Sequence, residues 1–149
     1  MTTSLSPLDL AERPARPACP NTEQLLVWAV RRWYLHGNIS REIEVGFLSL
    51  CGIAEIETAL VAFNDLMATL ARHGRRRMIL GGPRGGFSHD ERSILTLLAV
   101  HQHEDETYAA AILSWLVPAG VAERLSAYAT LLAGTLTRSG HILPVPPLH

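Results

Sequence analysis

A group of five arginines in the middle of the chain has the clearest potential for chemistry. Residues 66–89 contain no Asp or Glu, so nothing within this stretch neutralises them. Arginine presents a planar fork of donors that matches carboxylate and phosphate groups, and neighbouring glycines let backbone amides approach an anion. These side chains predict a surface that binds an anionic partner. They are Arg72, Arg75, Arg76, Arg77 and Arg84.

The same arginine-rich stretch has three interpretations. An acidic protein surface is one partner, and nucleic acid or a phosphoester, bound through residues 72–84, is another. The third is a solvated loop whose arginines pair with carboxylates elsewhere in the chain. The glycines do not form a nucleotide-binding phosphate loop, because no Lys-Ser or Lys-Thr pair follows them and no clear strand precedes them. The sequence therefore indicates a basic surface and leaves its partner open.

A second polar cluster covers residues 101–106, His-Gln-His-Glu-Asp-Glu. Histidines and carboxylates suit first-row metals, and on a helix His101 and Asp105 would share one face. A metal site needs about three or four converging ligands, and the run is not the His-Glu-x-x-His zinc motif. His101, His103 and Asp105 are therefore secondary candidates beside a polar turn whose acidic residues favour the start of the next helix. We predict no metal and no cofactor.

Two further groupings are better explained by structure than by chemistry. Ser88, His89 and Asp90 include the residue types of a hydrolase triad, but successive helical residues point about 100° apart and cannot relay a proton. Ser88 with Glu91 instead matches the Ser-x-x-Glu capping box of a helix start. The aromatic and arginine residues of 28–34 could stack nucleobases, but such clusters more often form a core with the arginines directed outward. No catalytic set remains, so we expect a protein that is not an enzyme.

Apolar spacing and capping residues predict helices for most of the chain between residues 21 and 140. Asn21–Thr22, Ser40 and Ser88 are typical residues at helix starts. Apolar residues spaced three and four apart give the stretch from Ile53 to Leu70 the a/d seam of a coiled coil. The predicted helices cover about residues 21–36, 40–51, 53–73, 88–101, 106–117 and 121–139.

These helices define the fold class and the domain organisation. We predict an all-α protein, a compact bundle of about five to six helices with a basic, Gly- and Arg-rich loop in the middle. Residues 1–20 contain four prolines and little apolar periodicity, which predicts a flexible leader. Residues 21–140 form a single helical domain, and residues 141–149 form a flexible, Pro-rich tail.

Composition limits the function classes. Apolar residues make up 48% of the 149 residues, which excludes global disorder, and the net charge of −1 predicts no overall attraction to nucleic acid or anionic lipid. All 13 basic residues are arginine, which is typical of a GC-rich bacterial gene. Two cysteines are too few for a disulfide scaffold, the N-terminus lacks a signal-peptide pattern, and the longest uncharged run, 107–122, is too short to span a bilayer. We expect a cytoplasmic protein without a membrane span.

These observations favour a small bacterial regulatory, adaptor or assembly protein that acts through protein–protein contacts at the arginines. The apolar seam of residues 53–70 could also pair with a second copy and form a homodimer. A nucleic-acid-binding protein that uses the loop 72–84 is the first alternative. A small metal- or cofactor-binding protein, or an enzyme, that uses His101 and His103 is the second.

Overall fold

The computed structural model describes residues 20–82 and 86–146. The predicted leader up to residue 19, with Cys19, lies outside the described residues, as do Arg84 and residues 147–149. Within the described ranges all regular secondary structure is helical, as predicted, and no helix there has the length and apolar character needed to cross a membrane. The six helices are α1 (Pro20–His36), α2 (Arg41–Cys51), α3 (Ile56–His73), α4 (His89–Gln102), α5 (Glu106–Leu116) and α6 (Ala119–Arg138).

Three helices begin where a side-chain oxygen binds an otherwise free amide of the first turn. Ser40 Oγ accepts such a hydrogen bond at α2, and the Asp105 carboxylate accepts one at α5. At α4, Ser88 and Glu91 form the predicted capping box. Because the first amides of a helix have no intrahelical partner, these caps determine where the helices start.

The starts of α1 and α3 differ from the prediction. α1 begins at Pro20 instead of following a cap at residues 21–22, because proline lacks the amide that a first turn leaves unpaired. α3 begins at Ile56, since Gly52 ends α2 with a positive φ of 79° and a short turn follows. Ile53, predicted to open the apolar seam, therefore lies before the helix and is 83% exposed.

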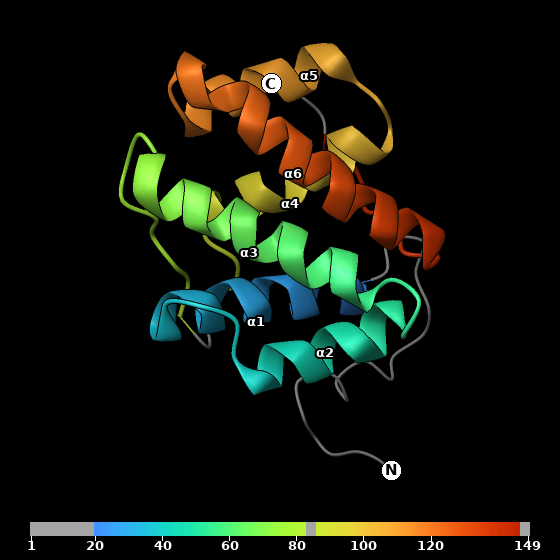
Figure 1. The fold of residues 1–149 in the computed structure, drawn as a ribbon. Coiled ribbons are helices and arrows are strands. Elements are labelled where there is room, and N and C mark those ends of the chain that lie inside the picture. Colours follow the sequence, from blue (N-terminus) through green and yellow to red (C-terminus); the bar gives the residue numbers. More distant parts are fainter. Residues whose placement is uncertain (1–19, 83–85, 147–149) are drawn as a thin grey trace.

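Helix α3 crosses the middle of the molecule, with α1 and α2 on one side and α5 and α6 on the other (Figure 1). Its residues Phe63, Met67 and Leu70 are buried inside one continuous core, where Phe63 packs against Phe47 with ring centroids 5.0 Å apart. These seam residues pack against other helices of the same chain. It is therefore not available for pairing with a second copy.

The described part of the tail, residues 141–146, packs against the helices. The Gln102 side chain donates a hydrogen bond to His141 O at 2.7 Å and accepts one from Leu143 N at 2.8 Å. The Leu143 side chain is 1% exposed and belongs to the main core. The contacts of the helical domain thus continue past residue 140, where the sequence placed its end.

Replacement of Leu143 by alanine tests this packing. We expect Leu143→Ala to lower the free energy of unfolding by about 2–4 kcal/mol, because it removes buried methyl groups and leaves a cavity. The neighbouring Ile142 is 41% exposed, so Ile142→Ala is a matched control that should change stability by about 0.5 kcal/mol or less. Urea unfolding followed by circular dichroism measures both. Equally small effects would show that the tail is not part of the core.

Candidate functional site: a basic surface braced by buried carboxylates

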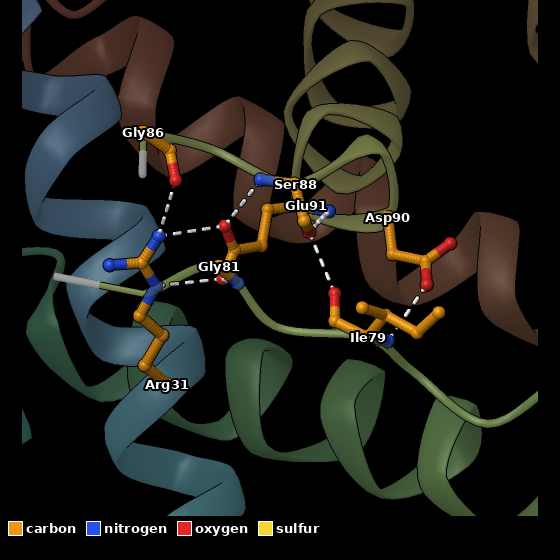
Figure 2. A network of polar contacts seen from close by, with 7 residues as sticks. All are labelled: Arg31, Ile79, Gly81, Gly86, Ser88, Asp90 and Glu91. Atoms are coloured by element: carbon orange, nitrogen blue, oxygen red, sulfur yellow. Dashed lines mark hydrogen bonds and ion pairs between the residues drawn. The ribbon is translucent and has the colours of Figure 1, made fainter. Parts of the chain in front are cut away.

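The segment between α3 and α4 carries the predicted arginines, and its described residues, 74–82 and 86–88, form neither helix nor strand. The first turn of α4 holds this segment in place (Figure 2). Asp90 Oδ2 accepts a hydrogen bond from Ile79 N at 2.8 Å, and Ser88 Oγ donates one to Ile79 O at 2.7 Å. Both backbone polar groups of Ile79 are therefore paired without a neighbouring strand.

Glu91 is the centre of this network. Its side chain has no exposed surface. Oε1 accepts hydrogen bonds from Ser88 N at 2.8 Å and Arg31 Nη2 at 2.9 Å. Oε2 accepts hydrogen bonds from Arg31 Nε at 2.7 Å and Gly81 N at 3.0 Å. The bidentate pair with Arg31 joins α1 to α4, while the two amides attach the loop to the same carboxylate (Figure 2).

A glycine is required at position 81 for this arrangement. A Cβ there would collide with the carbonyl oxygen of Gly86 and lie 2.7 Å from Arg31 Nη2. The same Arg31 nitrogen donates a hydrogen bond to Gly86 O at 3.0 Å. Gly81 therefore lets two parts of the loop approach each other and the Arg31–Glu91 pair. Its role is internal, whereas the sequence suggested an approach to a bound anion.

The hydrogen bonds around Glu91 keep the pair ionised. Burial by itself raises the pKa of the Glu91 carboxyl, but the hydrogen bonds from Arg31, Ser88 and Gly81 outweigh burial and hold this pKa below its ordinary value of 4.5. The hydrogen bond to Glu91 in turn raises the pKa of the Arg31 guanidinium. Both groups are therefore charged at neutral pH.

Arg75 is fixed to the end of α5. Its backbone N donates a hydrogen bond to Leu116 O at 2.9 Å, and its Nε donates one to Ser114 O at 2.8 Å. These acceptors are carbonyls near the C-terminus of a helix, where partial negative charge favours a cation. Arg75 is exposed but held in position.

Arg76 is stacked on an exposed tryptophan. Its guanidinium carbon lies 4.1 Å from the centroid of the Trp115 ring, and its Nη1 forms an ion pair with Asp90 Oδ1 at 3.2 Å. The Trp115 side chain is 46% exposed, and the His89 ring lies edge-on to it with centroids 5.7 Å apart. Of the arginines in the described part of the loop, only Arg76 forms an ion pair with a carboxylate of the protein.

Arg72 and Arg77 are exposed, and neither forms an ion pair with a residue in the described ranges. Arg72 lies in the last turn of α3 and lines a cleft of about 230 Å³ between α3 and α6. Arg124 lines the same cleft. The exposed arginines and the tryptophan beside them form the basic surface, which consists of Arg72, Arg75, Arg76, Arg77 and Trp115.

Sequence reasoning missed Trp115, His89 and Arg124. The apolar spacing of α5 predicts Trp115 on the buried face of that helix, whereas its side chain is 46% exposed. His89 was considered only as a member of a rejected triad. Arg124 is isolated in the sequence between apolar residues and one glutamate, and only the packing of α6 against α3 places it beside Arg72.

The second predicted cluster is not assembled as a metal site. His101 Nε2 contacts Ser126 Oγ at 2.9 Å, and its Nδ1 contacts a backbone oxygen at 2.8 Å. His103 Nε2 lies 3.2 Å from a backbone oxygen of the tail, and Asp105 caps α5. α4 ends before His103, so His101 and Asp105 share no helical face. Across residues 20–82 and 86–146, no three His, Cys, Asp or Glu side chains are grouped to hold a metal ion.

Comparison with known proteins offers no relative from which a function could be carried over. No known protein family, curated protein or solved structure matches the chain. Function must therefore be inferred from the residues of the site and their geometry.

Removal of the Glu91 carboxylate tests the network. We expect Glu91→Ala to lower the free energy of unfolding by about 3–5 kcal/mol, because it leaves Arg31 and two loop amides without their acceptor. Hydrogen exchange at Gly81 N should also accelerate. The matched control is Glu123→Ala, an exposed acid on α6, with an expected change of about 0.5 kcal/mol or less. A loss of less than about 1 kcal/mol at Glu91 would contradict the proposed bracing.

The pH dependence of stability tests the charge on Glu91. Its pKa is lower in the folded protein than the ordinary 4.5, so the unfolded chain binds the proton more readily as the pH falls. Its stabilisation is present above the ordinary pKa and is lost as the pH falls through the lowered one. Glu91→Gln cannot titrate here. The stability difference between wild type and this variant should therefore shrink as the pH falls below the ordinary pKa of 4.5, and a constant difference would contradict the assignment.

Proposed function

We propose that the protein is a small, non-enzymatic adaptor or assembly subunit that binds an acidic segment of a protein partner through the basic surface. The support comes from the local excess of arginines, from the contacts that hold two of them in place, and from the exposed tryptophan beside them.

The observation that carries the proposal is the stack of Arg76 on Trp115. Tryptophan and arginine are the residues that most often dominate the binding energy of protein interfaces. Here Arg76 is held between Asp90 and the indole ring, and Arg75 is tied to α5. Because these side chains are already ordered, they lose less conformational entropy when a partner binds.

Charge favours an acidic partner. Asp90, the carboxylate paired with Arg76, is 5% exposed and also accepts the Ile79 amide, so it has little capacity to neutralise further cations. Arg72 and Arg77 are left for a partner. Charges beyond about 10 Å are screened at ordinary ionic strength, so this local excess acts even though the net charge of the chain is −1.

Nucleic acid is the alternative partner for the same side chains, since arginines bind phosphates and an exposed tryptophan can stack on a base. Nucleic-acid-binding domains usually carry a substantial positive charge over a whole face. The net charge of −1 and the small extent of the basic surface favour a protein partner.

Affinity capture with surface variants tests the proposal. The tagged full-length protein is used to capture partners from nuclease-treated extract of its native host, and the dissociation constant is then measured with the purified partner. We expect Arg77→Glu to weaken binding about tenfold or more, because a favourable contact becomes repulsive. Trp115→Ala should weaken it similarly. Affinity should fall as salt rises from about 50 to about 500 mM.

Matched controls separate the basic surface from general effects of charge and size. Arg41→Glu reverses an exposed arginine on α2, and Leu131→Ala truncates an apolar side chain that is 50% exposed. Both should leave binding unchanged. A partner that binds all four variants equally would refute the assignment of this surface. Capture of nucleic acid instead of protein from a parallel extract without nuclease would favour the alternative.

A further inference from the structure

We infer that the cleft between α3 and α6 is a binding site for a single oxyanion, a carboxylate or a phosphate group, held by Arg72 and Arg124. This goes beyond the proposed function, because the cleft can bind a small anion without any protein partner. Two independent features support the inference: the way the two helices bring the cations to one cleft, and the lack of an ion pair to either of them among the described residues.

The cleft is built from one stripe of each helix. Asp65, Thr69 and Arg72 follow one another on α3 at spacings of four and three, so they share a face. Arg124 and Tyr128 are four apart on α6 and face the same space. The stripes enclose a volume of about 230 Å³ that is open to solvent.

The two ends of the α3–α6 pair differ in how charge is balanced. Near the start of α3, Arg138 of α6 forms a bidentate pair with Glu55, with both hydrogen bonds at 3.0 Å. Near the end of α3, Arg72 and Arg124 line one cleft, and neither is in an ion pair within the described part of the chain. Two cations that line one cleft attract an anion more strongly than either would alone.

The position of Arg124 is not explained by the helix dipole. Arg72 and His73 lie in the last turn of α3, where cations favour the helix dipole. Arg124 instead follows in the second turn of α6, towards the partially positive end, where a cation contributes nothing to the dipole interaction. A ligand anion would give this arginine a partner.

The lining also limits the ligand. The available donors are two guanidinium forks, the Tyr128 hydroxyl and the His73 ring. Asp65 lines the cleft as well and repels an anion, so the oxyanion belongs at the end near Arg72. The cleft has a volume of about 230 Å³, which leaves room for a phosphate group or a carboxylate beside the two arginines.

Arginine side-chain NMR tests the inference with the full-length protein. The Nε–Hε signals are followed during titration with inorganic phosphate and, separately, with a capped tri-glutamate peptide, each at constant ionic strength. We expect at least one probe to shift the Arg72 and Arg124 signals saturably, while the Arg41 signal stays unchanged. Arg124→Ala should weaken binding about tenfold to a hundredfold, because a charge-assisted hydrogen bond is lost. Arg124→Lys should give an intermediate loss, since it keeps the charge but not the fork.

The two probes distinguish the source of the oxyanion. Saturation by phosphate alone identifies a phosphoryl ligand, and competition by the peptide identifies a protein carboxylate as an occupant. The inference is overturned if neither probe causes a saturable shift up to about 20 mM, or if Arg41→Ala weakens binding as much as Arg124→Ala. Because Arg77→Glu tests the partner surface and leaves the cleft unchanged, failure of the cleft and failure of the proposed function are separate results.

Discussion

The carboxylate of Glu91 has no contact with solvent, and a charge in such a place must be balanced inside the protein. Four hydrogen bonds provide that balance, two from Arg31 of α1 and two from amides of the loop and the helix start. An arrangement that satisfies all of them allows only one placement of α1 relative to α4. It also ties the amides of Gly81 and Ser88 to the same carboxylate, so the paired charge holds the two helices and these two residues of the loop together.

Two adjacent acidic residues at the start of α4 serve different purposes. Glu91 points inward to Arg31, whereas Asp90 holds the Ile79 amide and the guanidinium of Arg76. The loop is thus fixed from inside by carboxylates and presents its cations outward. A surface that is ordered before binding retains more of its interaction energy as affinity than a mobile loop with the same residues.

The carboxylates of the fold pair with some arginines and leave others without a partner among the described residues. Arg31, Arg138 and Arg76 have carboxylate partners in the fold, while Arg72, Arg77 and Arg124 have none among the described residues. Arg72, Arg77 and Arg124 belong to α3, to the loop that follows it and to α6. A chain with a net charge of −1 can therefore present a positive end to an acidic group.

The sequence alone determined the helices, because their signals are local. The cap at Ser40, the Ser88–Glu91 capping box and the apolar spacing of α3 each depend on residues within a few turns of one another. The excess of arginine was equally visible, since composition needs no structure.

Only the tertiary structure decided what individual arginines do. Arg31 was grouped with aromatic residues as an outward-directed side chain, yet its partner Glu91 lies 60 residues away in the sequence. Trp115 has apolar spacing but is 46% exposed, because Arg76 and His89 cover its ring only in part. Leu143, assigned to a flexible tail, is buried because the chain folds back over the bundle. Each of these outcomes depends on which distant segments pack together, and local spacing carries no information about that.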